Sequence, residues 1–187
     1  MVALSSRYRF SVEDYHRMAD SGILGENDRV ELIDGEILTM SPIGSRHIAV
    51  VNFLNQHMVS MSRSNALVQV QNPILLGDHS EPEPDLTVVK LRDDYYASGL
   101  PTAADTLLVI EVADATLDYD RQIKLPLYAR HGIPEAWLVD LVTNRVEVHR
   151  GPTHAGYEQH DRFEGEQLVV SPGFAEIELT ADAILLR

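Results

Sequence analysis

The sequence predicts an α/β domain of the α+β type, in which helices flank a mixed central sheet, with an N-terminal hairpin and a C-terminal strand extension. Three observations support this fold class. An Asp-Gly pair stands between two alternating segments, which is a strong hairpin signal. A later segment has apolar residues three and four positions apart, as an amphipathic helix does. Strand-like segments then lie on both sides of a helical segment, in the order of a right-handed parallel crossover.

The N-terminal third of the chain is expected to hold two helices and the hairpin. Ser11 is a suitable N-cap for a short helix, because Asp14 stands three residues later in the position of a capping box. The hairpin turns at Asp34-Gly35, within the segment RVELIDGEILTM. The amphipathic helix falls within residues 41–64. Its expected apolar positions are Ile48, Val51, Leu54, Met58 and Met61.

The middle of the chain is expected to form three strands. They lie within residues 66–77, 84–91 and 106–114, and a loop around Gly99 separates the last two. Residues 107–110 are a continuous apolar run, which is typical of a strand buried on both faces. This third strand is therefore expected near the centre of the sheet.

The C-terminal third is expected to begin with a helix over residues 118–130. Residues 136–150 then form a hairpin turned at Thr143-Asn144, and the tail over residues 163–186 forms a short strand pair and a last small helix. Since no internal repeat or linker-like run divides the chain, residues 1–187 are expected to fold as a single domain.

The charge balance limits the partners of the protein. The chain has 29 acidic against 15 basic residues and a formal net charge of −14, and its only lysines are Lys90 and Lys124. Proteins that bind nucleic acid usually carry a basic surface, so this acidity counts against tight, non-specific DNA binding without a divalent metal or a partner. Two interpretations stay open, an acidic surface that confers solubility and a cluster of carboxylates at a cation site.

Other features of the composition exclude several classes of site. The chain has no cysteine, so disulfides and thiolate metal sites are excluded. The N-terminus lacks a long apolar run, and no stretch approaches the roughly 20 apolar residues of a membrane span. We therefore expect a cytoplasmic location and no association with a membrane.

Two carboxylates stand at strand ends where they could meet. Asp85 follows Pro84, which fixes an extended entry into its strand, and Glu111 interrupts the apolar run of the next strand. A lone buried carboxylate is unfavourable unless it is paired, protonated or bound to metal. If the two strands are neighbours, Asp85 and Glu111 converge at one edge of the sheet and offer hard oxygen ligands suited to Mg²⁺ or Mn²⁺. The alternatives are a solvated Asp85 and a Glu111 that pairs with an arginine.

Five segments, in this order, resemble the motifs of the Uma-type restriction endonucleases, a family of the PD-(D/E)XK nuclease superfamily. They are ELIDGEI, SRHIAV, EPEPDLTVV, LLVIEVAD and KLPLYARHGIPEAWLVD. The resemblance runs from about residue 10 to the C-terminal end. It implies a metal-dependent phosphodiesterase site on a restriction-endonuclease-like core of helix, three-stranded meander, helix and strand.

The resemblance also implies roles for single residues. Asp85 and Glu111 match the two acidic metal ligands, and the backbone carbonyl of Val112 matches a third ligand. Glu31 matches an upstream acidic position that joins such sites. Lys124 matches a lysine of the helix after the third strand, and would support the nucleophilic water or the transition state.

The sequence departs from the wider superfamily at Ala113, where the lysine usually stands. Lys124 lies on the following helix, which begins near the strand end that carries Glu111, so its side chain could reach back over that edge. Pro126 leaves two arrangements open: Lys124 lies in the first turn of a helix kinked at Pro126, or just before such a helix. A surface lysine is the alternative interpretation.

Two further polar residues are secondary candidates. His47 matches the family's histidine at the beginning of the amphipathic helix, where it would contact phosphate, act as an acid or base, or pack. Gln71 could order water near the site, although a polar residue on a strand needs no such role.

Three functions follow from these observations. The first is a metal-dependent nuclease that hydrolyses phosphodiester bonds of DNA with Mg²⁺ or Mn²⁺, and by analogy with the superfamily it would pair as a homodimer. The second is a binding module on the nuclease scaffold, which the net charge of −14 favours. The third is a metal-dependent hydrolase of smaller phosphate esters.

Overall fold

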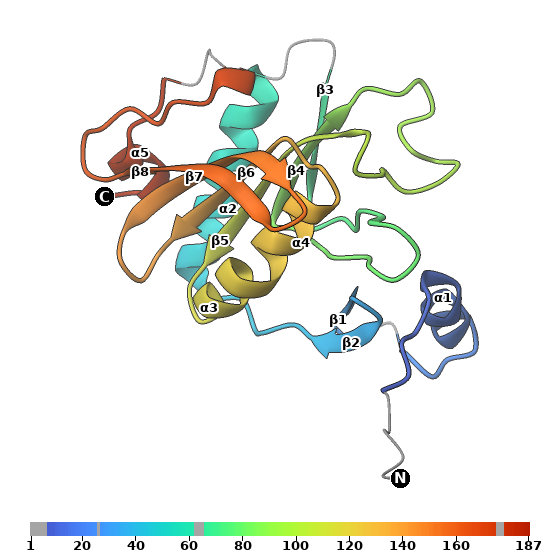
Figure 1. Ribbon diagram of the computed structural model, residues 1–187. Helices are drawn as coiled ribbons and strands as arrows, with labels where there is room; N and C mark the ends of the chain where they lie inside the picture. Colours follow the sequence, from blue (N-terminus) through green and yellow to red (C-terminus); the bar gives the residue numbers. More distant parts are fainter. Residues whose placement is uncertain (1–6, 26, 62–65, 175–177) are drawn as a thin grey trace, which may run out of the picture.

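The computed structural model describes residues 7–25, 27–61, 66–174 and 178–187, and its strands form a hairpin and a six-stranded sheet (Figure 1). The strands are β1 (Val30–Ile33), β2 (Glu36–Thr39), β3 (Ala66–Val70), β4 (Leu86–Lys90), β5 (Thr106–Ala113), β6 (Glu135–Asp140), β7 (Arg145–Thr153) and β8 (Gly156–Phe163). The helices are α1 (Val12–Asp20), α2 (Ser45–Met61), α3 (Leu117–Tyr119), the π-helix η2 (Asp120–Lys124), α4 (Leu125–Arg130), the 3-10 helix η3 (Pro172–Phe174) and α5 (Ala181–Leu185).

The large sheet is mixed, as predicted. Its strands follow the order β3-β4-β5-β6-β7-β8, in which β5 and β6 run parallel and all other neighbours run antiparallel. The parallel pair is joined by the continuous helical segment α3–η2–α4, as the strand–helix–strand pattern predicted. The sheet therefore has the crossover that brings a helix over the end of β5.

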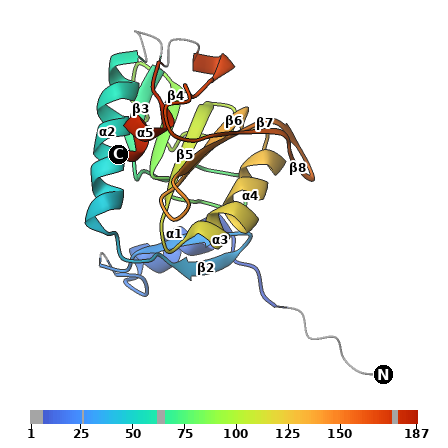
Figure 2. The same ribbon diagram turned by 90° about the vertical axis from the view of Figure 1, so that its left-hand side faces the viewer.

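Helices cover the sheet on both faces (Figure 2). Helices α2 and α5 pack on one face, where Leu54 and Ile184 join the apolar side chains of β4 to β7. Helix α4 covers the other face, where Leu127 packs with Val109 and Leu138. Alternate residues of β5 and β6 thus enter two separate apolar layers, which explains why these strands are apolar almost throughout.

The predicted elements of the N-terminal third are confirmed. Ser11 and Asp14 form the capping box of α1, since the side chain of each accepts a hydrogen bond from the backbone amide of the other. Asp34 and Gly35, with φ values of 49° and 76°, form the tight turn between β1 and β2. Along α2, Val51, Leu54 and Met58 are buried as predicted, whereas Ile48 is half exposed.

The C-terminal part differs from the prediction in two ways. The sequence pattern predicts no strand over residues 156–162, yet residues 156–163, GYEQHDRF, form β8 against β7. This edge strand has mostly exposed polar side chains, so no apolar alternation marks it. The strand pair predicted over residues 163–186 is a single bridge between Leu168 and Thr180, and residues 175–177 of that segment lie outside the described residues. The predicted last helix is α5.

Among the described residues, each helix is too short or too polar to cross a membrane.

Candidate active site

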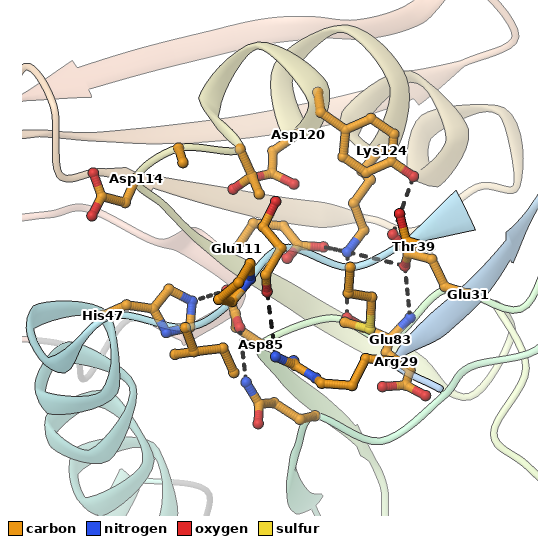
Figure 3. Close-up of a pocket in the computed structure, with 18 of the residues that line it drawn as sticks. Arg29, Glu31, Thr39, His47, Glu83, Asp85, Glu111, Asp114, Asp120 and Lys124 are labelled. Carbon is orange, nitrogen blue, oxygen red and sulfur yellow. Dashed lines mark hydrogen bonds and ion pairs between the residues drawn. The ribbon is translucent and has the colours of Figure 1, made fainter. Parts of the chain in front are cut away.

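A pocket of about 370 Å³ lies where the β1–β2 hairpin, the beginning of α2 and the α3–η2 segment meet the ends of β4 and β5 (Figure 3). Six carboxylates line this acidic pocket: Glu31, Glu83, Asp85, Glu111, Asp114 and Asp120. Two permanently charged cations, Arg29 and Lys124, line it as well. The predicted side chains of Glu31, His47, Asp85, Glu111 and Lys124 are therefore all at one place.

Strand pairing brings Asp85 and Glu111 together. Leu86 pairs with Ile110 in the antiparallel β4–β5 ladder, so the next residues outward, Asp85 and Glu111, lie side by side on the sheet face that α4 covers. The backbone amide of Val112 donates a hydrogen bond to Asp85 Oδ2 at 2.8 Å, which fixes the carboxylate against β5. Val112 itself is not among the residues that line the pocket.

Lys124 reaches into this cluster from η2. Its Nζ lies 2.8 Å from Glu111 Oε1 and 3.4 Å from Glu31 Oε2, and it donates to the carbonyl oxygen of Glu83 at 3.3 Å. The lysine is only 3 % exposed, so it is not a surface residue. The ammonium group that the strand lacks at Ala113 is thus supplied by the next helix.

The local helix geometry explains how Lys124 is presented. The backbone N–H of Leu125 bonds to the carbonyl of Asp120, five residues earlier, which is the wider π-type turn. Pro126 follows directly in the first turn of α4, where it has no amide hydrogen to donate and its ring would crowd the carbonyl four residues back in a regular α-helix. Lys124 therefore ends the π-turn immediately before α4, inside one continuous helical segment.

Glu31 is a buried anchor of the pocket. From β1, its carboxylate pairs with Lys124, accepts a hydrogen bond from the Tyr119 hydroxyl at 3.1 Å and accepts one from the backbone amide of Glu83 at 3.1 Å. These contacts join the hairpin, the helical segment and the residues before β4. Glu31 thus holds the ammonium of Lys124 from the side opposite to Glu111.

His47 and Gln71 both approach Asp85. His47 Nε2 lies 2.9 Å from Asp85 Oδ2, and the Gln71 side-chain amide donates to Asp85 Oδ1 at a long 3.4 Å. His47 Nδ1 is buried and has no hydrogen-bond partner within the described residues. The structure therefore places both secondary candidates around one carboxylate.

Asp120 and Tyr128 are residues of the site that the sequence analysis missed. The Tyr128 hydroxyl donates a hydrogen bond to Glu111 Oε1, and buried Asp120 accepts one from Thr116 at 2.6 Å while it lines the pocket. Both stand four residues from Lys124 in the sequence, so they share its helix face. That spacing points to them only once Lys124 is known to face the pocket, because the π-turn sets how this helical segment is turned about its axis.

Burial and repulsion between neighbouring carboxylates raise the pKa values of three carboxyl groups of the pocket, those of Glu83, Glu111 and Asp120. Burial raises the pKa of Glu111 to about 8, with Asp120 and Asp85 adding to the rise and Lys124 opposing it. Burial also raises the pKa values of Asp120 and Glu83. For Lys124, burial lowers the pKa, but Glu111, Glu31 and Asp120 outweigh this and raise it above the usual value. Lys124 therefore remains an ammonium ion at neutral pH.

The donor set of the pocket fits a hard divalent cation in its chemistry. Carboxylate oxygens are the ligands that Mg²⁺ and Mn²⁺ prefer, and an excess of buried carboxylates needs a compensating positive charge. Within the described residues, Glu111 Oε2 has no hydrogen-bond or ion-pair partner, and Asp85 Oδ1 accepts only the long hydrogen bond of 3.4 Å from Gln71. No group of three or more His, Cys, Asp or Glu side chains in the described ranges is already arranged around a common metal position.

The mixed sheet, with carboxylates at adjoining strand ends and a lysine from the next helix, agrees with the restriction-endonuclease-like class that the sequence motifs resemble. The chain is a member of the Uma2 family, described as "Putative restriction endonuclease", whose model matches residues 12–182. This agrees with the family resemblance of the motifs.

Among solved structures, the fold is similar to that of "a putative nuclease belonging to DUF820" from Anabaena variabilis. The two share 19 % sequence identity with a TM-score of 0.74, over 95 % of this chain and 98 % of that chain. At this identity the likeness concerns the fold alone. No curated protein matches the chain.

Proposed function

We propose that the protein is a metal-dependent endonuclease that hydrolyses phosphodiester bonds of DNA in the acidic pocket. The observation that carries this proposal is the position of Lys124, whose Nζ lies 2.8 Å from Glu111 although the strand has Ala113 in the usual lysine position. An ammonium group beside two strand-end carboxylates suits phosphoryl transfer, because it can stabilise the negative charge that develops on the phosphate.

Asp85 and Glu111 would hold Mg²⁺ or Mn²⁺, with the backbone carbonyl of Val112 as a third oxygen. When bound there, such an ion lowers the pKa of a water molecule and polarises a phosphoryl oxygen. Glu111 must release its proton to act as a ligand, since its pKa is raised to about 8 by burial. The neighbouring Lys124 favours the ionised form of Glu111.

The other residues of the pocket position these groups. Glu31 and the Glu83 carbonyl hold the Lys124 ammonium against the Glu111 carboxylate, so that the cation is oriented before the substrate arrives. His47 and the Val112 amide hold Asp85 Oδ2, and the Gln71 side-chain amide donates a long hydrogen bond of 3.4 Å to Oδ1. His47 contacts Asp85 in the free protein, so its first role is to orient this carboxylate.

Cleavage of plasmid and single-stranded DNA in Mg²⁺ or Mn²⁺ tests the proposal. We expect wild type to cut, and Asp85→Asn to lower the rate by about 100-fold or more, in line with the loss of one charged group from a phosphoryl-transfer site. Glu164→Gln is the matched control, because Glu164 pairs with Arg145 on the surface and neither residue lines the pocket. Wild type that cuts nothing with either metal, or an Asp85→Asn variant that cuts equally well, would refute the proposal.

The net charge of −14 favours a second candidate, a binding module without a working site. Calorimetry with Mn²⁺ separates the two. A nuclease binds the ion in wild type but not in Asp85→Asn, whereas a module without the site binds none in either. Hydrolysis of a small phosphate ester without cleavage of DNA would identify the third function instead.

A further inference from the structure

The arginines of this protein are almost all neutralised by carboxylates. Within the described residues, every arginine except Arg29 and Arg46 lies within 4.0 Å of an Asp or Glu oxygen. The two exceptions bond to neutral oxygens only. Arg29 donates to the carbonyl of Ser41 at 3.3 Å, and Arg46 donates to the carbonyl of Leu141 and to Asn144 Oδ1 at 2.7 Å each.

One of these two guanidinium groups lies in the pocket, and the other lies on the turn between β6 and β7. Arg29 lines the acidic pocket, whereas Arg46, which precedes the pocket residue His47 at the beginning of α2, is held by Leu141 and Asn144 and is not a lining residue. Both arginines are exposed. His47 contacts Asp85 from helix α2, and Arg29 lines the same pocket from the residues before β1 (Figure 3). In a molecule with a net charge of −14, these are the two described arginines without a carboxylate oxygen within 4.0 Å, and the charge of Arg29 acts on the nearby carboxyl group of Glu83, whose pKa it lowers against the effect of burial.

The depth of the pocket restricts the form of the substrate. Glu111 and Lys124 are each only 3 % exposed, so a phosphate must enter the pocket to reach them. The connection between β2 and α2 forms one wall, which includes the apolar residues Met40, Pro42 and Ile43. A phosphate of an intact duplex is held on a stiff rod, whereas an unpaired strand can turn one nucleotide inward and rest a base on an apolar wall.

Electrostatics also favours an unpaired strand over a duplex as the substrate. A duplex carries about one negative charge per 1.7 Å of its axis, twice the density of one strand, and binds through many basic contacts. The described surface offers few such contacts, because Lys124 is buried and Lys90 donates to the carbonyl of Ala104 away from the pocket. Two arginines without a carboxylate partner can bind the few phosphates that a single strand places next to the pocket.

We propose that the substrate is an unpaired nucleic-acid strand, and that Arg29 and Arg46 bind its phosphates on either side of the nucleotide that enters the acidic pocket. This inference rests on the proposed nuclease function and names its substrate class and two phosphate-binding residues. Arg29 and Arg46 act in binding, outside the Asp85–Glu111–Lys124 group.

Fluorescence anisotropy with a labelled oligo(dT) strand, in Ca²⁺ and over a series of salt concentrations, measures this binding directly. We expect Arg29→Gln and Arg46→Gln each to weaken binding about tenfold, as for loss of a charge-assisted phosphate contact. Each should also reduce the slope of log affinity against log salt by about 0.7, the value for one phosphate of a single strand. Arg46→Lys should keep that slope, since it keeps the charge.

Two comparisons complete the experiment. Arg150→Gln is the matched control, because Arg150 pairs with Asp161 and lies opposite Glu135, at the other end of the β6–β7 pair from Asn144, and it should bind as wild type does. A blunt duplex that contains the same strand should bind at least about tenfold more weakly than the strand alone. Equal affinity for strand and duplex, unchanged slopes in both glutamine variants, or no binding by wild type would each overturn the inference.

The test also separates this inference from the nuclease proposal. Arginine-dependent binding of the strand by a protein that cuts no DNA would leave the binding site standing and refute the nuclease. If cleavage depends on Asp85 but binding of the strand is unchanged in the Arg29 and Arg46 variants, the nuclease proposal stands and the binding site is refuted.

Discussion

Lys124 and Ala113 show why the ammonium comes from a helix in this protein. Ala113 is completely buried in the apolar layer between the sheet and α4, where it packs with Leu125 and Leu127. A lysine at this position would need to bury its charge among these side chains or displace them. Lys124 instead enters the pocket from η2, where Glu111 and Glu31 receive the charge.

The Lys124→Met variant should lose cleavage and stability together. Removal of the ammonium leaves Glu31 and Glu111 buried without their cation, which costs about 3 kcal/mol of unfolding free energy above about pH 8, where Glu111 is ionised. The loss should be smaller below about pH 8, because burial keeps a proton on Glu111 there. Urea unfolding at several pH values measures the loss, and plasmid cleavage measures the activity.

Two further variants separate the role of the charge in folding from its role in cleavage. Lys124→Met combined with Glu111→Gln should recover part of the stability, since no unpaired charge remains at position 111, yet should stay inactive. Lys90→Met removes the other lysine of the chain and should cut as wild type does. An active double variant would contradict a role for Lys124 and Glu111 in the reaction.

The sequence could predict the members of the site that depend on strand pairing and motif. Asp85 and Glu111 follow from adjacent strands, and Lys124 from its place after β5. Asp120 and Tyr128 depend on how η2 and α4 are turned about the helix axis, and the π-turn sets that angle. Since the π-turn follows from tertiary contacts and from Pro126 together, the sequence pattern did not reveal it.

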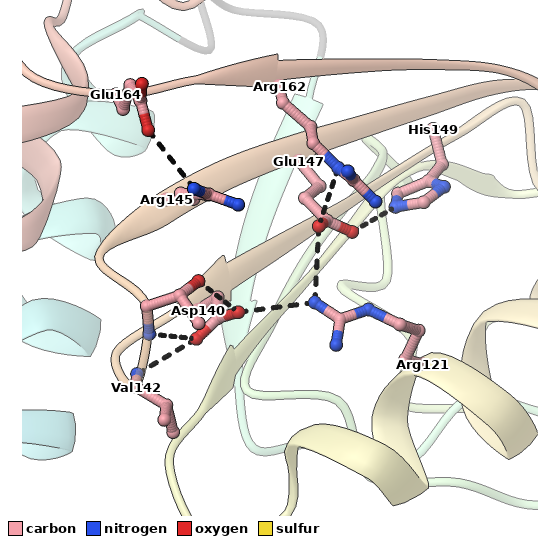
Figure 4. Close-up of polar contacts among 9 residues, drawn as sticks. Arg121, Asp140, Val142, Arg145, Glu147, His149, Arg162 and Glu164 are labelled. Carbon is pink, nitrogen blue, oxygen red and sulfur yellow. Dashed lines mark hydrogen bonds and ion pairs between the residues drawn. The ribbon is translucent and has the colours of Figure 1, made fainter.

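At the scale of elements, Arg121 fixes η2 on the sheet (Figure 4). Its Nη2 lies 3.2 Å from Asp140 Oδ2 of β6 and 3.2 Å from Glu147 Oε1 of β7. The pKa of Glu147 is lowered to about 2 by the hydrogen bond from His149 and by the charges of Arg121 and Arg162, against the effect of burial. Glu147 is therefore a firm anionic anchor for the helical turn that carries Lys124.

Arg121→Met should slow cleavage, because η2 loses its ion pairs to the sheet and Lys124 is then no longer held in a fixed position. Arg162→Met is the control, since Arg162 bonds to the same Glu147 oxygen at 3.1 Å but comes from β8. We expect both variants to lose about 1 kcal/mol or less of unfolding free energy, as for partly exposed ion pairs. Only Arg121→Met should lower kcat, by about tenfold, which corresponds to a misplaced catalytic group.

Measurements of kcat and of urea unfolding on both variants separate a role of Arg121 in positioning η2 from a role in the general stability of the sheet. If Arg162→Met slowed the reaction as much as Arg121→Met, the network would act only through the general stability of the sheet, and η2 would need no separate anchor.

The elements that the sequence predicted are those with a strong local signal. The hairpin at Asp34-Gly35, helix α2 and strand β5 each have a turn dipeptide or an apolar pattern of their own. Strand β8 has neither, because its backbone pairs with β7 while its side chains face solvent. Edge strands of this kind form through tertiary context, which a single segment of sequence does not contain.

At the scale of the whole molecule, the negative charge is concentrated where the proposed chemistry needs a cation. Six carboxylates and only two fixed cations line the acidic pocket, in a chain whose net charge is already −14. Protonation of Glu111 relieves part of this excess in the free protein. A bound divalent ion would neutralise more of this negative charge. Binding of an ion in the pocket should therefore change the free energy of unfolding of the whole protein.

Mn²⁺ should stabilise the protein in a pH-dependent manner. In the unfolded chain, Glu111 loses its proton near pH 4.5, but burial keeps that proton up to about pH 8 in the folded protein. Because the folded state holds the extra proton between these two values, the free protein should lose stability as pH rises through this window. Mn²⁺ must displace the proton to bind Glu111, so its stabilising effect should be small at acidic pH and reach its full size above about pH 8. At 100 times its dissociation constant, a bound ion adds about 2.7 kcal/mol to the free energy of unfolding.

Thermal unfolding with and without Mn²⁺ across this pH window measures the stabilising effect of the ion. EDTA should reverse this effect, and Asp85→Asn should abolish it. An Mn²⁺ effect that is equal at all these pH values, or that survives in Asp85→Asn, would place the ion elsewhere on the acidic surface.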